Sequence, residues 1–206
     1  MATRLPRSSA GSWRGCVHAT ETGPVPLKIL VAGGFGVGKT TLVSALSEIP
    51  PLLTEETMTT ASVGIDDVDV VPDKRTTTVA MDFGRITVDD SLILYLFGTP
   101  GQDRFWFMWD ELARGSVGAV VLVDLRRVDD CFPAIDYFEN RRVPFVVAVN
   151  GFPDAERFAI PAVRDALALS PDTPVVRMDA RAADTGFATL VTLVEHALER
   201  AKASTN

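Results

Sequence analysis

One short stretch constrains this chain more than any other: residues 33–40, with the sequence GGFGVGKT. It has the form G-x-x-x-x-G-K-[ST], whose glycines let successive backbone N–H groups turn toward one anion. The lysine brings a positive charge to the outer phosphates, and the hydroxyl can bind Mg²⁺. An apolar run at 27–31 precedes the stretch, and apolar residues at helical spacing follow at 41–49. The sequence therefore predicts a strand, a phosphate-binding loop and a helix, with Lys39 on the phosphates and Thr40 on the metal.

Composition narrows the class of protein. The chain has 206 residues, 47% of them hydrophobic, and a formal net charge of -7. This length suffices for one α/β domain with a sizeable core, and the acidic balance argues against bulk nucleic-acid binding. The two cysteines, Cys16 and Cys131, offer neither a disulfide framework nor a zinc site, which fits a reducing cytoplasm. No run reaches ~18 apolar residues, so we expect no transmembrane helix.

The order of the segments predicts one folded domain at 27–203 behind a flexible tail at 1–26. The tail is rich in Ser, Gly, Pro and Arg; a docking arm for an acidic partner or a membrane surface is the alternative. Residues 52–77 lack a steady period and predict a long loop. Next, 78–88 and 91–97 predict an antiparallel hairpin. The other strands are expected at 27–31, 117–124, 144–150 and 174–179, and helices at 129–140, 154–169 and 184–203.

This alternation predicts an α/β fold with a mixed sheet of six strands, five parallel and one antiparallel, flanked by about five helices. In such folds, ligands bind beyond the carboxyl ends of the strands, where the phosphate loop is expected to lie.

A second informative segment, 97–105 with the sequence FGTPGQDRF, follows an expected strand. It resembles switch II of small GTPases of the Ras and Rab type, in which W-D-x-x-G-Q-E-R-F is common. The resemblance implies that the Gly101 N–H contacts the γ-phosphate and that Gln102 orients the attacking water. With Lys39, these are the expected catalytic residues of a phosphoryl transfer, which needs positioning and charge stabilisation more than covalent chemistry.

A third segment, Thr76-Thr77-Thr78 followed by VAMDF, is similar to the T-I-G-V-D-F of Rab-like switch I. That alignment implies that Thr78 binds Mg²⁺, with Thr76 and Thr77 as alternatives in register. The loop at 52–77 then becomes switch I, which γ-phosphate and Mg²⁺ would order.

Two further segments stand where small GTPases recognise the base. Small GTPases have N-K-x-D there; in NGFPD at 150–154 the Asn is in place, Gly151 replaces the Lys, and the Asp comes one position late. The segment DAR at 179–181 resembles S-A-K, whose Ala N–H meets guanine O6, so guanine is favoured over adenine. The expected nucleotide-binding residues are Gly33, Phe35, Gly36, Val37, Gly38, Lys39, Thr40, Thr41, Asn150, Asp154, Ala180 and Arg181.

The resemblance covers 27–200, and its details resemble one branch in particular: the small GTPases encoded in actinobacterial conservon operons, which are relatives of the gliding-polarity GTPase MglA. The runs VAMDFGRI at 79–86, LFGTPGQDRF at 96–105 and FVVAVN at 145–150 carry it. It implies a P-loop NTPase G domain that binds GTP or GDP with Mg²⁺. It also implies a roadblock/LC7-type partner and a sensor-kinase-like membrane protein, which would recruit this cytoplasmic protein to the inner face of the membrane.

Two departures from the small-GTPase pattern bear on activity. Gly98 replaces the Asp that holds Mg²⁺ through water, although MglA-type proteins also lack it. Phe35 replaces a small residue and would crowd Gln102. We therefore expect slow hydrolysis that a partner accelerates. Arg104 is either an arginine finger in cis or a surface arginine, and the aromatic run FWFMW at 105–109 is either a partner site or core.

Two other functions compete with a GTP-dependent switch. One is a nucleotide-locked pseudo-GTPase scaffold, which Gly98 and Phe35 favour and Gln102 and Thr78 oppose. The other is a P-loop kinase for a small molecule, which would need an arginine-bearing lid that the sequence does not show.

Overall fold

The computed structural model describes residues 23–50, 52–59, 76–101, 108–153, 155 and 158–204, with the backbone alone at 52–59 and 76–80. These residues form a seven-stranded sheet in the order β2-β3-β4-β1-β5-β6-β7. The strands are β1 Val25–Ala32, β2 Leu52–Thr59, β3 Thr76–Asp89, β4 Leu92–Gly98, β5 Ser116–Val123, β6 Phe145–Asn150 and β7 Val175–Met178. The helices are α1 Lys39–Leu46, α2 Trp109–Ala113, the 3₁₀ helix η2 Val128–Cys131, α3 Phe132–Arg141, α4 Ile160–Ala166 and α5 Ala183–Ala203.

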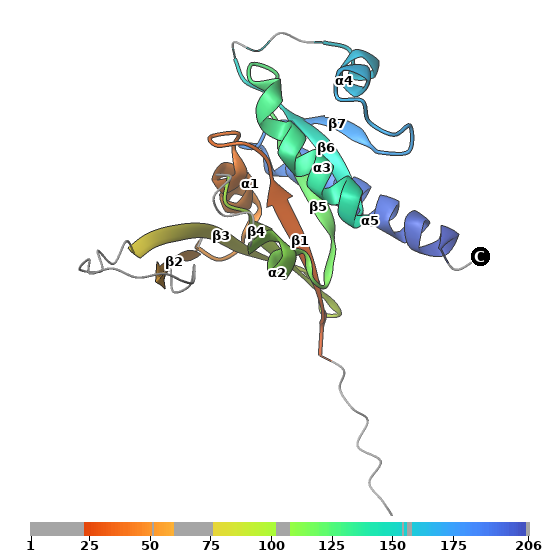
Figure 1. Ribbon diagram of the computed structural model, residues 1–206. Helices are drawn as coiled ribbons and strands as arrows, with labels where there is room; N and C mark the ends of the chain where they lie inside the picture. Colours follow the sequence, from red (N-terminus) through yellow and green to blue (C-terminus); the bar gives the residue numbers. More distant parts are fainter. Residues whose placement is uncertain are drawn as a thin grey trace, which may run out of the picture.

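The predicted mixed α/β sheet is confirmed. Strand β3 runs antiparallel to both β2 and β4, and the other neighbouring pairs are parallel. Figure 1 shows β3 and β2 extending to one side of the sheet, away from α4 and α5.

The prediction of a long loop at 52–77 was wrong for its first part, because β2 pairs residue by residue with β3 from Leu52↔Phe83 to Thr59↔Thr76. The sequence of β2, LLTEETMT, has no alternation of apolar and polar residues. An edge strand is held by main-chain pairing to one neighbour, so its sequence need not carry that alternation. Two predicted boundaries also move: β3 begins at Thr76 rather than 78, and α4 begins at Ile160 rather than 154.

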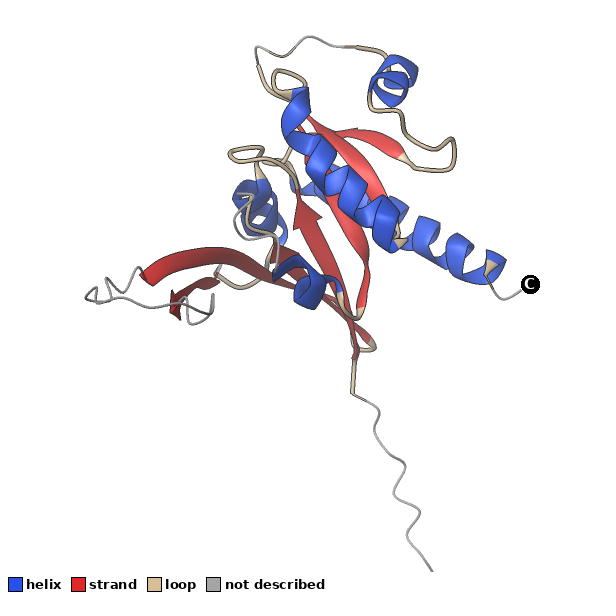
Figure 2. Cartoon of the chain, in the orientation of Figure 1, coloured by secondary structure: helices blue, strands red, loops and turns tan. Residues whose placement is uncertain are grey.

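The core has two layers, one on each face of the sheet, and Figure 2 shows helices on both sides of the strands. Successive residues of a strand point to opposite faces, so Ile29 of β1 joins the layer under α1 and α5, whereas Leu30 joins the layer under α2 and α3. Phe138 of α3 is fully buried in the second layer. Both faces are covered, and this is why the central strands are apolar at nearly every position.

The carboxyl ends of β1, β4, β5, β6 and β7 meet at one edge of the sheet, because these strands are parallel. The segments that follow them, including the phosphate loop after β1, therefore lie together at that edge. Among the helices in the described part of the chain, none is both long and apolar enough to cross a bilayer.

Candidate functional site

The phosphate loop joins β1 to α1 in the strand–loop–helix order that the motif requires. Gly33, Gly36 and Gly38 adopt positive φ angles of 131°, 71° and 107°, which L side chains rarely tolerate. A Cβ atom at Gly33 would also lie 2.5 Å from the carbonyl oxygen of Leu122 on β5. Glycine is therefore required here by both conformation and space.

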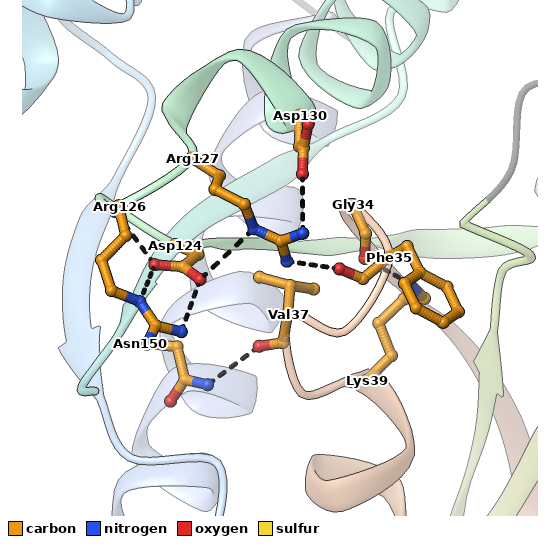
Figure 3. A network of polar contacts seen from close by, with 9 residues as sticks. All are labelled: Gly34, Phe35, Val37, Lys39, Asp124, Arg126, Arg127, Asp130 and Asn150. Atoms are coloured by element: carbon orange, nitrogen blue, oxygen red, sulfur yellow. Dashed lines mark hydrogen bonds and ion pairs between the residues drawn. The ribbon is translucent and has the colours of Figure 1, made fainter. Parts of the chain in front are cut away.

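Lys39 opens α1 and turns back over the loop, as Figure 3 shows. Its Nζ donates hydrogen bonds to the carbonyl oxygens of Gly33, at 2.9 Å, and Gly34, at 2.7 Å. Burial lowers the pKa of Lys39 to about 8, while the nearby Asp82 carboxylate acts in the opposite direction. A half-buried ammonium over a ring of backbone amides attracts an anion strongly, because little water screens it.

The structure brings Gly101 against the same loop. A Cβ atom at Gly101 would lie 2.6 Å from Lys39 Nζ and 3.2 Å from the backbone nitrogen of Phe35. Lys39 and Gly101, two of the three predicted catalytic residues, thus meet at one point. The third, Gln102, lies outside the described residues, as does Arg104.

A carboxylate that the sequence analysis missed lies at the predicted metal position. Thr40 Oγ1 donates a 2.8 Å hydrogen bond to Oδ2 of Asp82, which is 9% exposed. Phe83 pairs with Phe97 across β3 and β4, which places Asp82 beside Gly98. A Cβ atom at Gly98 would lie 2.8 Å from Asp82 Oδ2, so the carboxylate occupies the space beside the glycine.

A hydroxyl and one carboxylate fit a Mg²⁺ ion, which usually takes one or two protein carboxylates and completes its shell with phosphates and water. Within the described residues, no group of three or more His, Cys, Asp and Glu side chains could hold a metal by itself. The side chain of Thr78, the other predicted ligand, is not described, although its backbone lies on β3.

A cavity of about 620 Å³ lies where the base is expected. It is lined by residues at the end of β6 and after it, by residues at the end of β7 and after it, and by Leu125. Asn150, at the end of β6, connects this cavity to the phosphate loop: its Nδ2 donates to the Val37 carbonyl at 2.9 Å, and its Oδ1 accepts the Ala180 N–H at 3.0 Å. Figure 3 shows the first of these bonds.

The two residues expected to meet the base after β7 have their N–H groups engaged within the protein. The Ala180 N–H is bonded to Asn150, and the Arg181 N–H to Asp179 Oδ1 at 3.0 Å. The Arg181 guanidinium also donates to both oxygens of Asp179, and these bonds lower the pKa of Asp179 to about 2. The contact of Ala180 with a base stays a prediction, and Asp154 lies outside the described residues.

Phe152, two residues after Asn150, lies in the wall of the cavity. The guanidinium of Arg126 stacks on its ring, 3.9 Å from the centroid, and is itself bonded to Asp124 at 2.9 and 2.8 Å. This stack gives the cavity a rigid aromatic side without a lysine.

The remaining predicted residues differ in burial. Val37 is buried in the core, Thr41 is exposed on the first turn of α1, and the Phe35 side chain is 68% exposed. Of the aromatic run, Trp109 belongs to the core: it is 3% exposed and contacts Phe138, with ring centroids 5.7 Å apart. Residues 105–107 are outside the described part.

Cys131 is also buried, and burial raises the pKa of its thiol to about 12, which rules out a thiolate nucleophile at neutral pH.

Comparison with known proteins agrees with this geometry. A family model for a conserved hypothetical ATP binding protein matches residues 31–200. An uncharacterized protein of Methanocaldococcus jannaschii is 32% identical over 126 residues, covering 60% of this chain and 69% of that protein.

Two solved structures are similar in fold. The G domain of the T. maritima FeoB iron transporter matches with a TM-score of 0.56 and 18% identity over 86% of this chain and 99% of that one. The cytosolic domain of the same transporter, in its apo form, matches with a TM-score of 0.60 and 16% identity over 84% of this chain and 64% of that one. The fold is therefore that of a P-loop G domain.

Proposed function

Because this chain belongs to the family of conserved hypothetical ATP-binding proteins, we propose that it is a nucleotide-dependent switch that binds a purine nucleoside triphosphate and hydrolyses it slowly. The observation that carries the proposal is the meeting of Lys39 Nζ with Gly101 over the glycine-rich loop, where a Cβ atom at Gly101 would lie 2.6 Å from that nitrogen. A segment that contacts both the loop and its lysine is placed to respond to an outer phosphate bound there.

Each part of the site has a role in this proposal. The loop amides and the start of α1 bind the phosphates, and Lys39 adds a full charge. Thr40 and Asp82, with Thr78, would hold Mg²⁺, which neutralises charge on the phosphate oxygens. Gln102 would orient the attacking water, and Gly101 would follow the γ-phosphate.

We propose guanine as the base. The resemblance of 150–154 and 179–181 to the base-reading segments of small GTPases supports this choice. Adenine is the alternative, which the description of the family favours. Of the pocket residues that the structure describes, Asp179 is already paired with Arg181. We therefore propose Asp154 as the carboxylate that accepts from guanine N1 and N2.

We also propose a partner of the roadblock/LC7 type, in keeping with the resemblance to conservon GTPases, and recruitment to a membrane through partners. The exposed Phe35 at the rim of the phosphate loop supports a partner that rearranges the site, since an apolar ring in solvent gains free energy from being covered. Co-purification in the GTP and GDP states, with Phe35→Gly alongside, tests this: a partner that binds both states and the variant equally is not the sensor of the switch.

The test of the central proposal is a measurement of binding and turnover on purified protein. Nucleotide released by denaturation is identified, and Kd values for GTP, GDP, ATP and ADP are measured with Mg²⁺ and with EDTA. We expect GTP and GDP to bind most tightly, Lys39→Ala to lose binding, and single-turnover hydrolysis to be slow. Binding without any turnover, even with a partner, would favour the pseudo-GTPase scaffold. Preference for ATP would change the proposed base from guanine to adenine, and failure to bind any nucleotide would refute the proposed function.

A further inference from the structure

The segment after β5, residues 124–130, lies against the outer side of the phosphate loop, as Figure 3 shows. Its central contact is a hydrogen bond of 2.6 Å from Arg127 Nη2 to the carbonyl oxygen of Phe35. The guanidinium of Arg127 is held from behind by Asp130, at 3.6 Å, and by Asp124, at 3.9 Å. The Arg127 guanidinium, paired with two carboxylates, thus donates a hydrogen bond to the main chain in the middle of the loop.

This contact belongs to a tight junction between the two segments. A Cβ atom at Gly34 would lie 2.6 Å from Cβ of Asp130, so the loop leaves no room for a side chain there. At Gly36 the same atom would lie 3.6 Å from Arg127 Nη2, which is ordinary contact distance. The Phe35 peptide groups are therefore flanked by glycines on both sides and by the Arg127 segment on the outside.

We propose that Arg127 is a positioning residue for nucleotide binding, which sets the direction of the Gly36 N–H in the phosphate loop. The carbonyl of Phe35 and the N–H of Gly36 belong to one planar peptide unit, and in a trans peptide they point in opposite directions. Every described peptide bond is trans. While Arg127 holds the carbonyl on the outer side, the N–H stays turned to the inner side, where the phosphates are to bind.

The loop needs such a restraint because glycines make this peptide easy to rotate. Gly36 has a φ of 71°. Without a fixed carbonyl, the free loop would sample orientations in which the amide is turned away, and binding would have to select the productive one. The inference rests on the proposed function, because it concerns how the same loop binds its nucleotide.

The charges of residues 124–130 support a role in orienting the loop peptide rather than in attracting the phosphates. Residues 124–130 contain three aspartates and two arginines, so the segment as a whole is negative and does not attract phosphate over a distance. Arg126 points to the other side, onto Phe152, and Arg127 is the arginine of this segment that contacts the loop.

The test compares Arg127→Ala, Arg127→Lys and wild type, with Arg114→Ala as a matched control. The control removes the same charge from a side chain that is 77% exposed and paired with Glu111, far from the loop. Dissociation rates and Kd values are measured for fluorescent GDP and GTP, and the Gly36 amide is followed by ¹⁵N NMR in free and bound protein. Thermal unfolding without nucleotide monitors the fold.

We expect Arg127→Ala to weaken GDP and GTP binding by about tenfold, the scale of a lost hydrogen bond to a charged group. The Gly36 amide should shift in the free protein, Arg127→Lys should recover most of the affinity, and Arg114→Ala should match wild type. Unchanged affinity in Arg127→Ala would overturn the inference. The inference would also be overturned if Arg127→Ala lost affinity only in proportion to a lower unfolding temperature and Arg127→Lys did not restore it. That result would mean that Arg127 has a structural role only. A wild type that binds no nucleotide would refute the proposed function itself.

Discussion

Asp82 and Gly98 are neighbours on the antiparallel strands β3 and β4. The glycine provides space and the aspartate reaches into it from β3, so that the carboxylate meets the Thr40 hydroxyl. In the proposed site, Asp82 on the neighbouring strand would supply the carboxylate that position 98 lacks. The sequence did not reveal this, because strand register has to be known before two residues 16 positions apart can be placed side by side.

The first prediction follows from this arrangement. Asp82→Asn removes the negative charge and keeps the shape, so the Mg²⁺ concentration that half-maximally slows GDP dissociation should rise about tenfold or more. Fluorescent GDP release in a Mg²⁺ titration measures it. Asp90→Asn, at the exposed turn between β3 and β4, is the control. An unchanged Mg²⁺ dependence in Asp82→Asn would remove Asp82 from the metal site.

A second prediction concerns the glycine itself. Gly98→Ala would bring a Cβ atom to 2.8 Å from Asp82 Oδ2 and 2.9 Å from Asp82 Cβ. Both distances are shorter than van der Waals contact, so the two paired strands would have to move apart. We expect a loss of about 1–3 kcal/mol in the free energy of unfolding, measured by urea denaturation. Gly151→Ala, whose new atom would lie 3.5 Å from the Met178 carbonyl, should change stability little. Equal stability of the two variants would mean that the space beside Gly98 is not restricted.

Secondary-structure elements differed in how well the sequence revealed them. Strand β6, most of β5 and the second half of β1 are buried on both faces, so continuous apolar runs marked these strands. Strand β2 lies at an edge, where backbone pairing suffices and the side-chain pattern is weak. The site divides in the same way: the loop glycines and Lys39 could be found from their spacing, whereas Arg127 belongs to no motif and is defined only by where the segment after β5 packs.

Helix α5 carries a buried titratable group that gives a prediction at the scale of this element. Burial lowers the pKa of His196 below its usual 6.5, and Arg200 acts in the same direction, while Glu199 and Asp172 oppose it. The unfolded chain then binds a proton more readily than the folded one, so stability falls as the pH drops through 6.5 and is restored above it.

Urea denaturation between pH 5 and 7.5 measures this effect. His196→Gln should reduce the loss of stability at low pH, with the other histidine, His18, present in both proteins. Identical pH profiles for the two proteins would show that His196 has the same pKa in the folded and unfolded chain.

At the scale of the whole molecule, the proposed site draws its groups from elements that are distant in sequence. Asp82 comes from β3, Gly101 follows β4, Arg127 follows β5 and Asn150 ends β6, all around the loop after β1. A nucleotide bound there would connect the two halves of the sheet, so its binding free energy adds to the stability of the entire domain rather than to one helix.

The last prediction measures that linkage. At a free nucleotide concentration of 100 times Kd, binding adds about 2.7 kcal/mol to the free energy of unfolding. For a domain of this size, that raises Tm by roughly 5–10 °C. Differential scanning fluorimetry with GTP and Mg²⁺ should show this rise in wild type and not in Lys39→Ala, since the variant keeps the fold but lacks the charge over the loop. An equal rise in both proteins would place the nucleotide somewhere other than the phosphate loop, because Lys39 lies directly over that loop.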